Sequence, residues 1–413
     1  MGLRAEDRAV LRALAEKYMA FALSDENDEN RRLWRSLNDG HMQKPMVAID
    51  QMPWNELNPD GSLSCTVEDP YFRRIEWTLR SEIYKWERLR ADMVLNPYVL
   101  LPRLISNTGY GLRPEYELPD GARGFVSKRY VNQFKGPEDA EKIKTPVITV
   151  DREGEARVAA EAADVFDGIA PVRMQGIVLH LGFWDWIAQW MGVENCYIEL
   201  MDRPEMMHAI MERLTEATLD EIDQINALGL YDVNCNMCHC SYTFSDSLPS
   251  DGCDHENPTS RDGWAFGMAQ LFTSVSPQIT EEFEVRYMDR IFPRFGAIYY
   301  GCCDRLDDRL DVICRLPNIK KISCSPWSDR ENFAANLPDR YIMSNKPSPS
   351  FLAQPSFDED AVRADLRRTI AAAKKHGLRL ELLLKDISTV NNEPQRLTRW
   401  AQIAKEETLS AAL

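Results

Sequence analysis

The fold is indicated most clearly by the stretch Tyr299-Tyr300-Gly301-Cys302-Cys303-Asp304, which follows an apolar run at 295–300 and precedes a helix-like segment at 306–316. This pattern predicts a buried strand that passes through a short turn into a helix. In parallel α/β proteins, the turns after the carboxyl ends of the strands carry the chemistry. Two adjacent thiols at such a turn can bind a soft metal ion or act as nucleophiles. The stretch therefore predicts both a fold class and a candidate site.

The same strand-to-helix alternation extends along most of the chain. Strand-like runs are expected at 45–50, 98–106, 172–180, 230–235, 297–302, 320–324, 340–344 and 378–385, with helical patterns between most of them. Eight strands that alternate with helices predict a (β/α)8 TIM barrel. We expect one barrel domain over residues 1–413, with an N-terminal helical extension at 1–44 and a long insertion or lid at 107–145. Within the extension, the charged segment 25–32 is expected to be a connection between helices.

Composition narrows the class of protein. The chain has 413 residues, of which 44% are hydrophobic and 28% are charged, as is usual for a globular protein. The formal net charge of −16 disfavours binding to nucleic acid or to an anionic membrane, and suits a partner with a basic face. No apolar run reaches the roughly 20 residues of a membrane helix, and the N-terminus lacks a signal-peptide core. These features predict a cytoplasmic protein, with a homodimer as one expected assembly.

Chemically active side chains gather at the expected carboxyl ends of the strands. They are Asp50, His180, the cluster from Cys235 to Cys240 that includes His239, Cys302, Cys303, Cys324, the residues from Ser344 to Lys346, Lys385 and Asp386. Thiols, imidazoles and carboxylates are the donors of a zinc site that keeps an open coordination position. We therefore predict Cys302, Cys303 and His239 as metal ligands.

Each of these residues also has a purely structural interpretation. Free cysteines are usually buried as small hydrophobic residues, and neighbours on a strand point to opposite faces, so one of Cys302 and Cys303 would face away unless the strand has ended. His180 lies between apolar residues and can be a core histidine. The run from Cys235 to Cys240 lacks the second half of a structural zinc site, although Cys253 and His255 are near in sequence.

Three further residues are predicted to contact the substrate. Trp184 and Trp264 occupy loop-like positions, where an indole can form one wall of a pocket for a flat aromatic molecule or a corrin ring. Asp50 ends the first expected strand. Lys385 and Asp386 follow the apolar run 381–384, where a buried strand opens to the pocket, and we predict that they act in catalysis together with His180.

The order of these elements resembles the uroporphyrinogen decarboxylase superfamily, in its branch of corrinoid-dependent methyltransferases. The resemblance covers most of the chain and rests on three segments: 31–45, where a helix leads into a Pro-led first strand; 192–229, which contains Gly192-Val193-Glu194-Asn195 and Met201-Asp202-Arg203-Pro204; and 264–293. It implies a TIM barrel, a zinc ion and a methyl-accepting cobalamin carried by a corrinoid partner protein.

The sequence also departs from this family. The decarboxylases bind a polycarboxylate through arginines after the first strand, whereas this chain has Asp50 there, which would repel such a substrate. The methyltransferase branch places His-x-Cys at the fifth strand and a cysteine at the eighth, whereas this chain has Tyr300-Gly301-Cys302 and Lys385-Asp386. The resemblance therefore implies Cys302 as a zinc ligand. The candidates for the remaining ligands are Cys303, Asp304, His239 and Asp386.

These observations predict a demethylating methyltransferase, which moves a methyl group from a small methoxylated or methylated substrate to the corrinoid protein. A metal ion would polarise the departing oxygen, and His180, Lys385 or Asp386 would supply or accept a proton. The alternative is a metal-free decarboxylase or lyase that acts on a small carboxylic acid. A third class is a tetrapyrrole-binding protein without catalysis.

Overall fold

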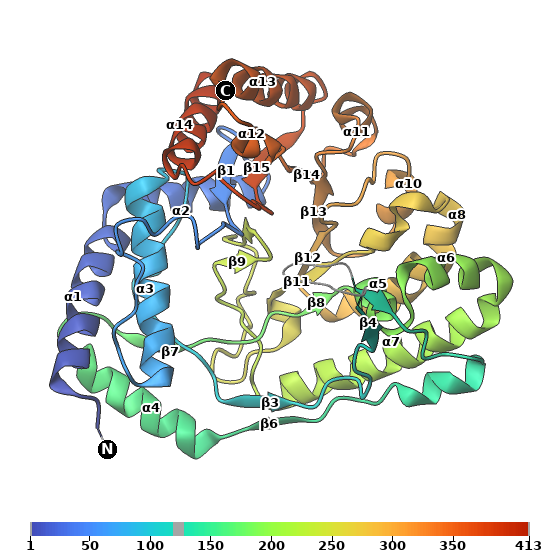
Figure 1. Ribbon diagram of the computed structural model, residues 1–413, viewed down its shortest axis with the longest axis horizontal. Coiled ribbons are helices and arrows are strands. Elements are labelled where there is room, and N and C mark those ends of the chain that lie inside the picture. Colours follow the sequence, from blue (N-terminus) through green and yellow to red (C-terminus); the bar gives the residue numbers. More distant parts are fainter. Residues whose placement is uncertain (1, 119–127, 412–413) are drawn as a thin grey trace.

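The computed structural model describes residues 2–118 and 128–411, and its centre is a parallel sheet with helices outside it (Figure 1). The sheet has seven strands in the order β1-β15-β14-β13-β12-β11-β8, and every neighbouring pair is parallel. The strands are β1 (Met46–Ile49), β8 (His180–Leu181), β11 (Trp264–Gly267), β12 (Ala297–Tyr300), β13 (Ile319–Cys324), β14 (Ile342–Asn345) and β15 (Arg379–Leu384). The protein is therefore a mixed α/β fold, in agreement with the predicted class.

The remaining strands form small pairs on the open side of the sheet, between β1 and β8. β2 (Val99–Leu101) is parallel to β7 (Val172–Met174). β3 (Ile105–Asn107) is antiparallel to β6 (Ile148–Val150), and β4 (Tyr116–Glu117) to β5 (Arg129–Tyr130). In the described residues, β1 and β8 are the edge strands of the large sheet. The predicted insertion at 107–145 contains β4 and β5, and its residues 119–127 lie outside the described part of the chain.

One predicted strand is wrong. The segment 230–235, which was expected to be the fourth strand, forms only a single bridge in the described residues, from Tyr231 to Ile177. The strand that pairs with β8 in the large sheet is instead β11, at 264–267. All four residues of β11 are buried, so the strand shows no alternation of apolar and polar residues, and its short apolar run follows a long polar loop. The prediction for 98–106 also changes, because this run is divided between β2 and β3.

Helices surround the sheet, and most of them begin where their sequence indicates. They are α1 (Ala5–Ala22), α2 (Asp25–Asn38), α3 (Pro70–Arg88), α4 (Arg152–Val165), α5 (Phe183–Met191), α6 (Val193–Asp202), α7 (Pro204–Ala227), α8 (Pro277–Thr280), α9 (Arg286–Ile291), α10 (Leu310–Ile313), α11 (Arg330–Asn336), α12 (Ser350–Ala353), α13 (Glu359–Lys375) and α14 (Gln395–Ser410). The charged segment 25–32, predicted as a connection, is instead the first half of α2. The Ser24 side chain caps this helix by accepting a hydrogen bond from the Asn27 N–H at 3.3 Å.

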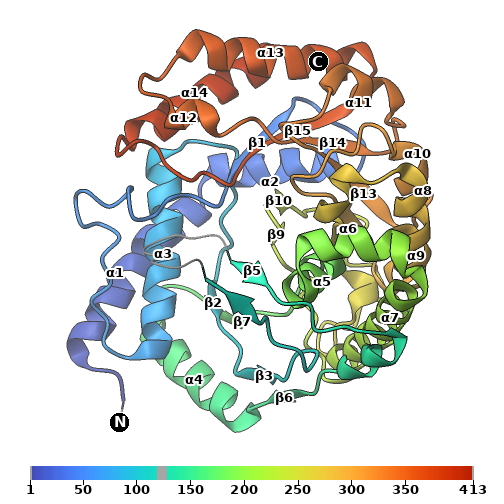
Figure 2. The ribbon, with the colours of Figure 1, turned by 45° about the vertical axis from the view of Figure 1, so that its right-hand side comes forward.

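A short hairpin lies within the ring of helices, close to the inner face of the sheet (Figures 1 and 2). It consists of β9 (Met237–Cys238) and β10 (Ser241–Tyr242), which pair antiparallel. The ammonium of Lys321 on β13 donates to Ser241 Oγ at 2.6 Å and to the Tyr242 carbonyl at 2.9 Å. It also pairs with Glu381 on β15 at 2.7 Å, and both charged side chains are fully buried. This buried ion pair therefore fixes the hairpin against two strands of the sheet.

Within the described residues, no helix is long and apolar enough to cross a lipid bilayer.

The Lys321–Glu381 pair gives a test of this arrangement. Replacing Glu381 by Gln leaves the Lys321 ammonium buried without a counter-charge, and we expect the free energy of unfolding to fall by about 3–5 kcal/mol. The double variant K321M/E381L removes both charges and should recover much of that loss. The matched control is Glu29→Gln, which breaks a half-exposed pair with Arg32 and should cost less than about 1 kcal/mol. Urea unfolding of the three variants measures these differences, and equal losses for Glu381→Gln and Glu29→Gln would contradict the assignment.

Candidate functional site

Cys302 and Cys303 lie just beyond the carboxyl end of β12, and both thiols turn to the same place. The strand ends at Tyr300, so the alternation of side chains no longer applies to the two cysteines. Gly301 has φ of +89°, and a Cβ there would come within 2.7 Å of Leu306 Cδ1. The Cys302 N–H donates to Asp304 Oδ1 at 2.8 Å. This turn brings the two sulfur atoms to 3.6 Å from each other.

The end of β15 supplies a lysine and an aspartate to these thiols. Lys385 Nζ donates to Cys302 Sγ at 3.0 Å and pairs with Asp386 Oδ2 at 2.8 Å. Cys303 Sγ donates to the same Asp386 oxygen at 3.0 Å. Asp386 is exposed and has φ of +55°, whereas Lys385 is only 3% exposed. The predicted catalytic pair and the predicted thiols therefore belong to one site.

The β9–β10 hairpin brings a histidine from a distant part of the sequence. His239, at the hairpin turn, places Nε2 3.6 Å from Cys302 Sγ. Its ring stacks on Phe266 of β11, with 4.0 Å between centroids and 13° between planes. His180, at the start of β8, lies next to it, with 5.9 Å between the two imidazole centroids. We refer to Cys302, Cys303, His239, Lys385 and Asp386 as the thiol site.

Electrostatics separate the protonation states within the thiol site. The hydrogen bond from Cys303 and the charge of Lys385 lower the pKa of Cys302, while the bond to Cys302 and burial raise the pKa of Cys303. Burial would lower the pKa of Lys385, but the charge of Cys302 and the contact with Asp386 outweigh it and raise that pKa. The stable arrangement therefore pairs a Cys302 thiolate with a Lys385 ammonium.

Burial keeps the imidazoles neutral. Loss of hydration lowers the pKa of His239 to about 2, and the nearby Lys385 and Lys346 charges act in the same direction. The pKa of His180 is also lowered, first by desolvation and then by Lys385. A neutral imidazole has a free lone pair, which is the form that binds a metal ion or accepts a proton.

The thiol site contains donor types that suit a zinc ion. One sulfur or oxygen atom each from Cys302, Cys303 and Asp386 lies within 4.8 Å of the others, and His239 Nε2 adjoins Cys302. Sulfur, imidazole nitrogen and carboxylate oxygen are the atoms that zinc takes as ligands. The residues present therefore fit a zinc ion.

The two tryptophans do not line an open pocket. Trp184 is fully buried in the first turn of α5, where it packs on Phe272 with 4.4 Å between ring centroids. Trp264 is 3% exposed and begins strand β11, so its loop-like position is a wrong expectation. Its ring lies 5.7 Å from Lys321 Nζ, which gives it a structural contact with the buried ammonium.

Asp50 lies at the carboxyl end of β1, as predicted, and is half-buried. Burial raises its pKa, and the charges of Lys85 and Lys385 moderate that increase. This places Asp50 on the same face of the sheet as the thiol site, and a role in substrate binding stays a prediction.

A cavity of about 300 Å³ next to His180 is absent from the sequence-based expectations. Its wall includes Tyr110, Leu179, His180, Trp186 and Glu221. Tyr110 comes from the segment predicted as an insertion or lid, and its ring lies 4.9 Å from that of Trp186. Its hydroxyl donates to Glu221 Oε2 at 2.6 Å. The signal in the sequence was the dense aromatic run Phe183-Trp184-Asp185-Trp186.

Lys346 lies at one of the expected strand ends, although the sequence assigned it no role. It follows β14, is 1% exposed, and donates to Ser344 Oγ at 3.0 Å and to the hydroxyl of Tyr299. Burial lowers its pKa to about 8. A lysine that loses its proton this readily can move a proton near neutral pH.

Comparisons with known proteins give a structural likeness but no match in sequence. No protein-family model matches the chain, and no curated protein matches it. Among solved structures, the chain is similar to a methyltransferase from Methanosarcina mazei, with 12% sequence identity and a TM-score of 0.49 over 91% of this chain and 97% of that chain.

The lowered pKa of His239 predicts a specific pH dependence of stability. The unfolded chain binds a proton at His239 below pH 6.5, whereas the folded chain does not until about pH 2, so stability should fall as pH decreases from 6.5. His239 should lower the free energy of unfolding by at most about 1.4 kcal/mol for each pH unit of this decrease. Urea unfolding of the metal-free protein between about pH 6.5 and 4.5 should show a shallower slope for His239→Gln than for the wild type. Equal slopes for the wild type and His239→Gln would contradict a neutral imidazole at this position.

Proposed function

We propose that the protein is a demethylating methyltransferase, which removes a methyl group from a small methoxylated or methylated substrate at the thiol site and passes it to a corrinoid protein. The observation that carries the proposal is the convergence of Cys302, Lys385 and His239 from three distant segments, with Cys302 Sγ 3.0 Å from Lys385 Nζ and 3.6 Å from His239 Nε2. Reactive groups with opposed pKa shifts are typical of functional sites. The sequence resemblance to the methyltransferase branch of the uroporphyrinogen decarboxylase superfamily points in the same direction.

A zinc ion is part of this proposal. Cys302, Cys303 and Asp386 would hold it, with His239 as the fourth candidate ligand. When bound, zinc supplies a Lewis acid that polarises the heteroatom carrying the methyl group. Lys385 would remain beside Cys302 and balance the negative charge that two thiolates and a carboxylate bring to one place.

The surrounding residues would bind the substrate and transfer protons to and from it. The cavity beside His180 offers two aromatic walls, Tyr110 and Trp186, which suit a flat methoxylated ring. His180 is neutral because of its lowered pKa and can accept a proton from a substrate. Lys385 carries its proton 3.0 Å from the sulfur, so it can donate to an oxygen that leaves without its methyl group.

The fold and the partner complete the proposal. The pair β2–β7 would fill the open side of the sheet. β7 and β8 both lie within the expected strand 172–180, so they would count as one barrel strand, and eight strands would form a (β/α)8 barrel with the thiol site at its mouth. The formal net charge of −16 suits a corrinoid protein that presents a basic face. A cytoplasmic location and a homodimer are the accompanying expectations.

Two buried cations favour a second candidate function. Lys346 and Lys385, each no more than 3% exposed, lie at the ends of adjacent strands and can attract a carboxylate. A metal-free decarboxylase or lyase acting on a small carboxylic acid would use them in this way. Zinc content separates the candidates, because near one zinc per chain favours methyl transfer and no zinc after zinc-supplemented expression favours the lyase.

The methyl-transfer proposal predicts a selective effect of Cys302. In an assay with reduced corrinoid protein and a panel of methoxylated aromatic compounds and methylamines, the wild type should form methylcobalamin. Cys302→Ser should reduce the rate by about 100-fold or more, because it removes a ligand and the thiolate partner of Lys385. The control Cys253→Ser changes a free thiol that is not among the five residues of the thiol site and should retain the wild-type rate. Absence of methylcobalamin with every donor, or equal rates for both variants, would overturn the proposal.

A further inference from the structure

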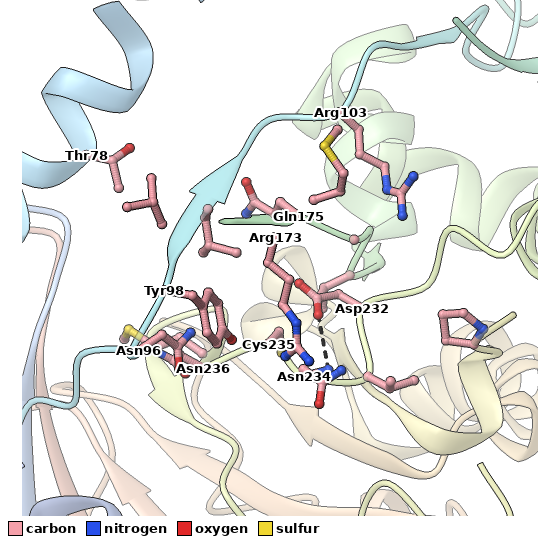
Figure 3. Close-up of a pocket in the computed structure, with 18 of the residues that line it drawn as sticks. Thr78, Asn96, Tyr98, Arg103, Arg173, Gln175, Asp232, Asn234, Cys235 and Asn236 are labelled. Carbon is pink, nitrogen blue, oxygen red and sulfur yellow. Dashed lines mark hydrogen bonds between the residues drawn. The ribbon is translucent and has the colours of Figure 1, made fainter. Parts of the chain in front are cut away.

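A second cavity, of about 660 Å³, lies between α3, β2, β7 and the segment 231–237 (Figure 3). Its volume is within the range of small-molecule sites, roughly 300–1,000 Å³. None of the five residues of the thiol site lines it. The segment 231–237 runs directly into β9, so the cavity lies at the base of the hairpin that carries His239.

Several polar side chains in this cavity lack a protein partner. Asn96 is only 6% exposed and lines the cavity, yet its side-chain amide makes no hydrogen bond within residues 2–118 and 128–411. The side-chain amide of Gln175, which is exposed, is also unpaired in this described part of the chain, and Figure 3 shows both residues at the cavity. A buried amide without a partner costs free energy, so such groups are normally satisfied by water or by a ligand.

The cavity also contains opposite charges that are not neutralised by ion pairs. Arg173 on β7 is exposed, has its guanidinium 4.9 Å from the centre of the Tyr98 ring, and has no carboxylate partner in the described residues. The half-buried Asp232 carboxylate accepts a hydrogen bond from the Asn234 N–H at 3.1 Å and likewise has no ion-pair partner there. By contrast, Arg103 at the edge of the cavity pairs with Glu155 at 3.1 Å. The Arg173 guanidinium and the Asp232 carboxylate are thus available to a ligand, and the exposed Glu256 adds a second unpaired carboxylate to the lining.

The geometry points to a binding site for a small zwitterion of the amino-acid class, whose carboxylate pairs with Arg173 and whose ammonium pairs with Asp232. A guanidinium binds a carboxylate through two parallel hydrogen bonds, which fixes the orientation of the ligand. The amides of Asn96 and Gln175 complete its hydrogen bonds. Val99, Met174 and Val178 provide an apolar wall for the ligand's side chain. This site goes beyond the proposed methyl transfer and does not depend on it.

Calorimetric titration of the full-length protein tests the site with defined probes. The first panel is the common free amino acids, and at least one should bind saturably with a Kd below about 10 mM. The next probes are the N-acetyl derivative and the carboxamide of the tightest binder, which remove the ammonium and the carboxylate respectively. Each should bind at least about tenfold more weakly than the free amino acid, because each loses one charge-assisted contact.

Variants then assign each charge to its residue. Arg173→Gln should weaken the binding of the free amino acid by about tenfold and leave the affinity for the carboxamide nearly unchanged. Asp232→Asn should also weaken the binding of the free amino acid by about tenfold, but should leave the affinity for the N-acetyl derivative nearly unchanged. The control Arg157→Gln removes an exposed arginine of α4 that does not line the cavity and should change neither affinity.

Three outcomes would overturn the proposal: no saturable binding of any free amino acid, equal affinity for the capped and free forms, or unchanged affinity in both charge variants. If Arg173→Gln does not fold, the capped probes on the wild-type protein decide the question. The thiol site is intact in every protein used, so a negative result here leaves the methyl-transfer proposal unaffected.

Discussion

The buried ammonium of Lys321 is the interaction on which the candidate site depends. It has Glu381 at 2.7 Å, Ser241 Oγ at 2.6 Å and the Tyr242 carbonyl at 2.9 Å, and the rings of Trp34 and Trp264 lie 5.4 and 5.7 Å away. These contacts join β13 and β15 to the β9–β10 hairpin. A buried charge without such partners would be very costly, so the hairpin and the two strands stabilise one another. The position of His239 beside Cys302 follows from this anchor.

The thiol site is built from three separate supports. β12 ends at Tyr300, and the turn at Gly301 brings both cysteines to one side. β15 ends at Leu384 and is followed by Lys385 and Asp386, and the hairpin presents His239. Each support is rigid because its backbone is paired with a neighbour, whereas the reactive atoms stand just beyond the paired region. Lys385 links two of the supports, since its ammonium contacts Cys302 Sγ and Asp386 Oδ2. The site therefore combines a fixed frame with side chains whose charges balance one another.

The sequence predicted the parts of the fold that local patterns encode. Seven of its eight expected strands correspond to observed ones, because apolar runs bounded by turn residues identify buried strands. The prediction of the fourth strand was wrong because Trp264-Ala265-Phe266-Gly267, the strand that is present, is too short to show a periodic pattern and follows a polar loop. The prediction of a connection at 25–32 was wrong because the charged residues obscure the helical pattern of α2, which begins after its N-cap residue Ser24. Cys302, Lys385 and Asp386 were recognised at strand ends, but their contacts, the anchor on Lys321 and the cavity beside His180 are long-range features without a local signal.

The central claim is that Cys302 and Cys303 act together with residues from β15 and the hairpin as a metal-binding site. Extended X-ray absorption fine structure at the zinc edge of the zinc-loaded protein tests it most directly. The account predicts two sulfur atoms at about 2.3 Å, with the remaining nitrogen and oxygen ligands at about 2.0–2.2 Å. A first shell made only of nitrogen and oxygen would place the ion away from both thiols and would contradict the account.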